Sequence, residues 1–190
     1  MSARTILCIR HGESTFNVAY RETGIDPLHP DARLTPRGEA QVREARLALR
    51  SVPVDLVVTS PLTRALQTTQ GIFADHPSAP RVLVEALHRE HCASSCDIGR
   101  SPAELAAEFP HLALDHLPET WWHVHDEPDE RGVCFEPIEA LQERVELFKD
   151  WLRARPEPRI AVVGHGTFFH HLTGQWLDNC GILPLDLDAL

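Results

Sequence analysis

Five residues of this chain combine the side chains that can transfer a phosphoryl group, and each follows a short apolar segment. They are Arg10, His11, Arg64, Glu90 and His165. Guanidinium groups bind oxyanions through paired N–H donors, and a neutral imidazole can act as a nucleophile. A carboxylic acid can protonate a leaving oxygen and then activate water. Because phosphoryl transfer depends mainly on positioning and charge stabilisation, these residue types together favour transfer of phosphate to a histidine.

The apolar segments before these residues are expected to be buried β-strands. Four such strands are predicted, at residues 5–9, 54–59, 81–84 and 160–163. Helical patterns alternate with them, at residues 36–52, 62–73, 102–109, 137–152 and 167–177. The alternation predicts an α/β fold, a three-layer αβα sandwich with a mostly parallel central sheet. Parallel strands end on one side of a sheet, so the five side chains are expected to converge there.

Local signals mark the helix starts and the irregular segments. Thr35-Pro36 and Ser60-Pro61 each combine an N-cap residue with a proline at the first helical position, and residues 101–104 match a capping box. Residues 14–33 are polar and are expected to form a long loop. Residues 110–135 show no clear period and are expected to be a surface excursion or lid over the site. The tail, with alternating leucines and aspartates, is expected to be poorly ordered.

Composition excludes several classes of protein. The 190 residues fit one domain, residues 1–190, with a full core. The net charge of −10 argues against nucleic-acid and anionic-membrane partners. No apolar run is long enough to span a bilayer, and the N-terminus lacks the apolar region of a signal peptide. Five cysteines without framework spacing suit a reducing compartment, so a cytoplasmic location is expected.

At its polar motifs the chain resembles the histidine phosphatase superfamily, also called the phosphoglycerate-mutase-like family. The matching stretches, all in family order, are Arg10-His11-Gly12-Glu13-Ser14 with Asn17, Leu34-Thr35-Pro36-Arg37-Gly38, residues 59–68 around Arg64, and Gly164-His165-Gly166. The resemblance covers residues 5 to 175. Together these motifs are highly specific, whereas Arg-His-Gly alone is not.

The resemblance implies roles for residues at matching positions. His11 would be the phosphorylated nucleophile, and Arg10, Arg64 and His165 would form the phosphate pocket. The proton donor is expected at Glu90, within Leu87-His88-Arg89-Glu90-His91, with Glu85 as the competing candidate. The substrate-binding positions are expected to be Asn17, Thr23, Gly24 and Gly166. Gly12 is expected to let the backbone approach the phosphoryl group, and the residues give no role for Glu13.

Three functions are weighed on this site. The first is a phosphomonoester hydrolase that needs no cofactor and acts on a small phosphorylated substrate. The second is a mutase that returns the phosphate to another substrate oxygen. It is less favoured because Arg131 is the only Lys or Arg in residues 110–135, although Arg100 could serve a second phosphate. The third is a binding protein without catalytic activity.

Some alternatives concern single clusters. Residues His88, His91, Cys92 and Cys96 could bind zinc, although their spacing matches no standard zinc motif, and His123 with His125 could form a second metal patch. No metal is expected. A disulfide between Cys92 and Cys96 is disfavoured in a reducing compartment. Trp121 and Trp122 either line a lid or pack on the core.

Overall fold

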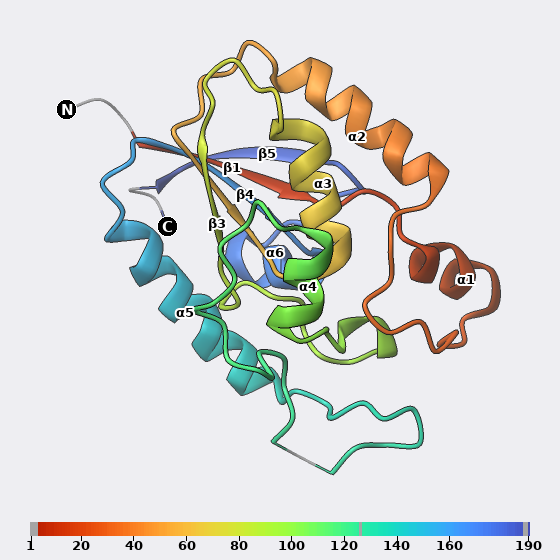
Figure 1. Cartoon of the computed structure of the whole chain (residues 1–190). Coiled ribbons are helices and arrows are strands. Elements are labelled where there is room, and N and C mark those ends of the chain that lie inside the picture. The colour runs from red at the N-terminus through yellow and green to blue at the C-terminus, as the bar shows by residue number, and fades with distance from the viewer. Residues whose placement is uncertain (1–3, 126, 188–189) are drawn as a thin grey trace.

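A five-stranded sheet forms the centre of the molecule (Figure 1). The computed structural model describes residues 4–125, 127–187 and 190. Its strands are β1 (Thr5–Arg10), β2 (Leu56–Thr59), β3 (Arg81–Val84), β4 (Arg159–Gly164) and β5 (Ile182–Asp186), in the order β3-β2-β4-β1-β5. The first four strands are parallel, and β5 runs antiparallel to β1. The predicted strands at 5–9, 54–59, 81–84 and 160–163 are therefore confirmed, with small shifts at their ends.

Helices cover both faces of the sheet, which confirms the predicted αβα sandwich. Figure 1 shows α3 in front of the sheet and α6 behind it. The larger helices are α2 (Pro36–Leu49), α3 (Thr63–Phe73), α5 (Ile138–Arg153) and α6 (Gly166–Thr173), and the smaller ones are α1 (Thr15–Thr23), η1 (Ser95–Asp97) and α4 (Pro102–Glu108). Among the described residues, no helix is both long and apolar enough to cross a membrane.

The alternation of side chains along the strands builds two separate core layers. Ile6 and Cys8 of β1 pack with the apolar residues of α5 and α6, such as Phe148 and Phe168. Ile9 lies in the other layer with residues of α2 and α3. Successive strand residues point to opposite faces, so a fully apolar strand serves both layers at once. Because both faces of β1 and β4 are buried, the ends of these strands are held in place. The polar residues that follow each strand are positioned with them.

The segment 14–33, predicted as a loop, contains α1. Ser14 caps this helix by accepting a hydrogen bond from the Asn17 N–H, and the Asn17 side chain accepts one from the Ser14 N–H. The arrangement is a capping box with asparagine where glutamate or glutamine is usual. The loop prediction failed because Phe16 is the only buried residue of the helix, so the apolar periodicity is weak.

The tail is also more ordered than expected. Residues 182–186 form β5, an edge strand in which Leu183 and Leu185 pack on the core while Pro184 and Asp186 are exposed. Helix α6 ends at Thr173 rather than near 177, because Gly174 adopts a left-handed conformation with φ of 75°. Helix α3 is capped at Leu62 instead of Ser60. The capping box at Ser101 is confirmed.

Residues 110–135 contain no helix or strand in their described part, as predicted. The segment is nevertheless partly core, because Leu114, Leu117 and Trp121 pack with Leu62, Leu66 and Leu105. Trp121 is buried and donates from its indole N–H to the Arg100 carbonyl. Of the two alternatives for this tryptophan, packing on the core is therefore correct.

Candidate functional site

Four of the five expected catalytic side chains line one cavity at the carboxyl edge of the sheet. Arg10 and His11 come from the end of β1, Arg64 from the first turn of α3, and Glu90 from the segment after β3. The cavity has a volume of about 280 Å³. His165 follows β4 and lies behind His11, with 5.2 Å between the two ring centroids. The predicted convergence of strand ends is thus what the sheet produces.

His11 is buried with its two ring nitrogens in different surroundings. Nδ1 lies 2.7 Å from the Gly12 carbonyl, and Nε2 accepts a hydrogen bond from Arg64 Nε over 3.2 Å. A guanidinium can only donate, so Nε2 carries the lone pair and Nδ1 carries the proton. Burial, with the charges of Arg64 and Arg10, holds the pKa of His11 well below its usual range. The ring is therefore neutral at neutral pH.

Arg64 is also buried, and all three of its nitrogens have partners. Besides His11, Nη1 donates to the Cys96 carbonyl at 2.6 Å and Nη2 donates to Asp97 Oδ1 at 2.9 Å. Asp97 was missed in the sequence because it lies in the segment 88–100, which has no regular pattern. Burial raises its pKa to about 6, while Arg64 opposes that rise and Glu90 adds to it.

Arg10 and His165 each keep one buried nitrogen without a partner in the described structure, Nε of Arg10 and Nδ1 of His165. Arg10 Nη1 donates to the Leu177 carbonyl at 2.7 Å. His165 Nε2 lies 2.7 Å from the hydroxyl of Ser60, the residue expected only to cap a helix. An unsatisfied buried donor costs free energy, so an anion that accepted from the Arg10 Nε–H would be stabilised.

Glu90 is held at the N-terminus of α6. Its carboxylate accepts hydrogen bonds from the backbone N–H groups of Thr167 at 3.1 Å and Phe168 at 3.0 Å. The competing acid, Glu85, accepts from the Leu87 N–H and does not line the cavity. Between the two candidates, the geometry therefore favours Glu90.

A buried ion pair fixes the segment that carries Glu90. Arg144 of α5 donates to both carboxylate oxygens of Glu136, at 2.8 and 2.7 Å. The same guanidinium donates to the carbonyls of Leu87, Arg89 and Glu90. These are five hydrogen bonds, which the five N–H donors of a guanidinium can make, whereas an ammonium has only three donors. The sequence showed Arg144 only as a polar position on the predicted helix.

Gly12 and Glu13 have structural roles that the sequence did not indicate. A Cβ at Gly12 would lie 2.8 Å from the Gly38 carbonyl oxygen, and one at Gly38 would lie 2.2 Å from the Glu13 carbonyl oxygen. Gly12 thus allows close packing against α2, and the expected approach of its backbone to a phosphoryl group stays a prediction. Glu13 is buried and its carboxylate binds Arg21 at 2.9 Å and the Thr35 hydroxyl at 3.0 Å.

The expected substrate-binding residues lie at different distances from the cavity. Asn17 lines it, and the Asn179 amide donates to both Asn17 Oδ1 and the His11 carbonyl. Gly166 opens α6 beside the Arg10 guanidinium. Thr23 and Gly24 stand at the exposed end of α1 and are not among the lining residues. No described residue of 110–135 lines the cavity either.

The proposed metal ligands do not assemble. His88 lies 3.1 Å from the Val163 carbonyl and stacks on Phe148, whereas His91 lies 2.7 Å from the Glu136 carbonyl. Within residues 4–125, 127–187 and 190, no three His, Cys, Asp or Glu side chains are grouped as a metal site. The five cysteines are free thiols.

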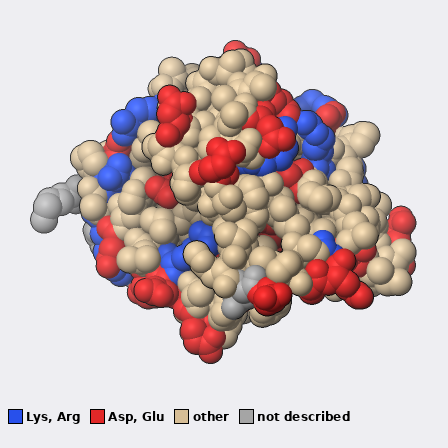
Figure 2. All heavy atoms as spheres, turned by 60° about the horizontal axis from the view of Figure 1, so that its bottom comes forward, with Lys and Arg blue, Asp and Glu red and all other residues tan. Residues whose placement is uncertain are grey.

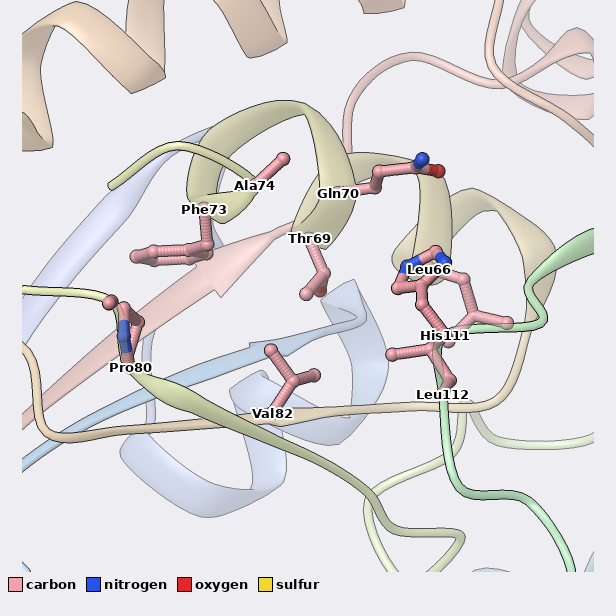
Figure 3. Close-up of a pocket in the computed structure, with 10 residues that line it drawn as sticks. Leu66, Thr69, Gln70, Phe73, Ala74, Pro80, Val82, His111 and Leu112 are labelled. Carbon is pink, nitrogen blue, oxygen red and sulfur yellow. The ribbon is translucent and has the colours of Figure 1, made fainter. Parts of the chain in front are cut away.

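A second cavity, of about 410 Å³, lies between α3 and β3 (Figure 3). Its walls are mainly Leu66, Phe73, Val82 and Leu112. His111 is the only titratable side chain that lines it, so this cavity lacks the groups needed for phosphoryl chemistry.

Fold and site together define an α/β protein with a cavity at the carboxyl edge of its sheet that two arginines, a histidine and a glutamate line. The family model of the histidine phosphatase superfamily (branch 1) matches residues 6–182, and the chain belongs to this superfamily. The family expected from the motifs is thus confirmed.

Relatives include both phosphatases and mutase-like proteins. A phosphoglycerate mutase-like protein from Arabidopsis thaliana is 29% identical over 93% of this chain and 76% of its own length. A glucosyl-3-phosphoglycerate phosphatase from Mycolicibacterium vanbaalenii is 26% identical over 98% of this chain and 78% of its own length. An α-ribazole phosphatase from Shigella flexneri superposes with a TM-score of 0.65 at 22% identity, over 96% of this chain and 90% of that chain. The last likeness concerns the fold alone.

Proposed function

We propose that this protein is a phosphomonoester hydrolase that forms a phosphohistidine on His11. The observation that carries the proposal is the hydrogen bond from Arg64 Nε to His11 Nε2. It leaves the Nε2 lone pair unprotonated in a cavity that two guanidinium groups also line. A neutral nucleophile beside two oxyanion binders is the arrangement that attack on a phosphate ester requires.

The reaction would take place in two steps. Arg64 Nε–H would turn from Nε2 to a phosphate oxygen, which frees the Nε2 lone pair of His11 to attack phosphorus. The bond from phosphorus to the ester oxygen breaks, and Glu90 gives that oxygen a proton. Arg10, Arg64 and His165 would bind the phosphate oxygens, while Nδ1–H keeps its contact with the Gly12 carbonyl. Water then attacks phosphorus, Glu90 takes the proton of that water, and the phosphorus–nitrogen bond breaks. Inorganic phosphate leaves, and the lone pair returns to Nε2.

The shortage of basic residues for a second phosphate favours hydrolysis over mutase chemistry. A mutase acting on a bisphosphate must hold two anionic groups at once. Arg131, the only Lys or Arg in residues 110–135, is paired with Asp129 at 2.6 Å and with Asp26 at 3.1 Å. Arg100 is paired with Asp31 at 2.8 Å and with Glu108 at 3.0 Å. Neither lines the cavity, so neither is placed to hold a second phosphate there.

Phosphate release from a broad phosphoester panel, measured with EDTA present, tests the proposal. The wild type should release phosphate, His11→Ala should not, and the exposed His29→Ala should behave as the wild type. Equal rates for the wild type and His11→Ala, including no release by either, would refute the proposal. Loss of wild-type activity on adding EDTA would indicate a metal-dependent reaction instead.

A further inference from the structure

The walls of the catalytic cavity differ between its two ends. His11, Arg10 and Arg64 surround the place for the phosphate. In an in-line displacement the leaving oxygen lies opposite the nucleophile, and under the proposed function it lies next to Glu90. The leaving group then occupies the part of the cavity lined by α1 and by residues 91–94.

Aromatic rings and small side chains line that part. On the α1 side, the rings of Phe16 and Tyr20 stack with centroids 5.4 Å apart and an angle of 12°, and Tyr20 is 48% exposed. His91 and Ala93, from the segment after β3, also line the cavity. The His91 ring is held by the Glu136 carbonyl at 2.7 Å and by the edge of Phe135. Fixed rings of this kind offer flat faces to a ligand at little cost in conformational entropy.

Positive charge is absent from the same part. Arg10 and Arg64 are the only Lys or Arg among the residues that the structure shows lining the cavity, and Glu90 and Asp97 also line it. Both arginines are needed for the phosphate. A second anionic group on the substrate would therefore meet two carboxylates and no cation of its own.

The arginines around the cavity do not change this balance. Arg100 and Arg131 are ion-paired as described above, Arg21 pairs with Glu13 at 2.9 Å, and Arg89 pairs with Glu136 at 3.2 Å. None of these four arginines lines the cavity. Figure 2 shows that Lys and Arg on this view of the surface are scattered among acids rather than gathered in one patch.

From these observations we infer the substrate class: a phosphate monoester of an uncharged, ring-bearing alcohol, whose ring lies between Tyr20 and His91. The inference rests on the proposed hydrolase function. It makes Tyr20 and Ala93 residues that determine specificity. Carboxylated or doubly phosphorylated substrates are disfavoured by charge, and acyclic alcohols are disfavoured by the loss of ring contacts.

A matched pair of substrates tests the charge requirement. We expect kcat/KM for 4-(hydroxymethyl)phenyl phosphate to exceed that for 4-carboxyphenyl phosphate by about tenfold or more, since a buried like charge is costly. Ala93→Arg supplies a cation for the carboxylate and should therefore lower the ratio of the two kcat/KM values about tenfold. Ala93→Gln, which adds similar bulk without charge, should leave the ratio as in the wild type. Equal or better use of the carboxylated substrate by the wild type would overturn the inference.

A second pair tests the ring requirement. Tyr20→Ala should raise KM several-fold for 4-(hydroxymethyl)phenyl phosphate and for the phosphate monoester of a ring-form sugar, and should leave KM for glycerol 1-phosphate unchanged. Tyr20→Phe, which keeps the aromatic ring, should show the wild-type pattern. A uniform change for all three substrates would contradict a ring subsite. If no phosphoester is hydrolysed, the proposed function itself fails. If esters are hydrolysed but carboxylated ones are preferred, only the substrate class fails.

Discussion

Arg64 Nε and His11 Nε2 are joined by a hydrogen bond of 3.2 Å between two fully buried side chains. The bond assigns the tautomer of His11, because the imidazole nitrogen can only accept from a guanidinium N–H. It also places a positive charge next to the atom that would receive the phosphoryl group. The two residues are therefore linked before substrate arrives, and their properties are best tested together.

Replacing Arg64 by lysine should impair the reaction strongly. An ammonium group cannot donate at once to His11, the Cys96 carbonyl and Asp97, as the planar fork does. We expect kcat/KM to fall by about a hundredfold or more, the usual effect of losing one oxyanion donor. Arg37→Lys, at an exposed arginine that pairs with Glu13, is the control and should retain activity. An active Arg64→Lys would show that a point charge is sufficient.

Glu90→Gln should affect substrates according to their leaving groups. A poor leaving group needs a proton and should lose a large part of its kcat, whereas p-nitrophenolate needs little protonation and should lose much less. Glu85→Gln is the control, since that acid caps a turn outside the cavity. The same loss for both kinds of substrate would remove Glu90 from the role of proton donor.

Asp97 should make anion binding depend on pH. Its pKa is raised to about 6, so the carboxyl is charged above this pH and neutral below it. When charged, it competes with an incoming dianion for Arg64 Nη2. Sulfate remains a dianion across the range, and its inhibition constant should therefore increase as the pH rises from 5 to 7.

Asp97→Asn provides the comparison for this pH effect, because an amide does not titrate. In this variant the increase in the sulfate inhibition constant should disappear or become much smaller. An unchanged pH dependence would mean that another group in the cavity controls binding.

The ion pair between Arg144 and Glu136 should contribute strongly to stability. Both side chains are buried, so Arg144→Gln takes from the Glu136 carboxylate its two shortest hydrogen bonds, leaves it only the longer one to Arg89 as an ion pair, and frees three carbonyls from their donor. We expect the free energy of unfolding in urea to fall by about 3 kcal/mol or more. Arg153→Gln, on the same helix but in an exposed pair with Asp150, should cost less than about 1 kcal/mol. Similar losses for both variants would contradict the role assigned to the buried pair.

Strong local patterns made most of the fold predictable. The strands were found because apolar runs that serve two core layers stand out in a sequence, and the helices α2 and α5 because one face of each is regularly apolar. Helix α1 and strand β5 were missed for the opposite reason, since each buries only part of its surface. Their stability comes from caps and from pairing with β1, which the sequence alone does not display.

The site residues also divide into those that a local sequence pattern reveals and those that it does not. That His11, Arg64, Glu90 and His165 lie close together could be predicted, because they follow strands whose ends must meet. Asp97 and Arg144 could not, because their roles depend on contacts between segments that lie far apart in the chain. The segment 88–100 gave no local signal for Asp97, since only its fold brings Asp97 against Arg64.

The most direct test of the central claim is to trap the phosphorylated enzyme. Rapid quenching during turnover of a 32P-labelled monoester, followed by peptide mapping, should find acid-labile, base-stable phosphate on His11, and His11→Ala should carry none. Label on a serine, an aspartate or another histidine would contradict the account. So would full turnover without any labelled His11 at quench times as short as a single turnover.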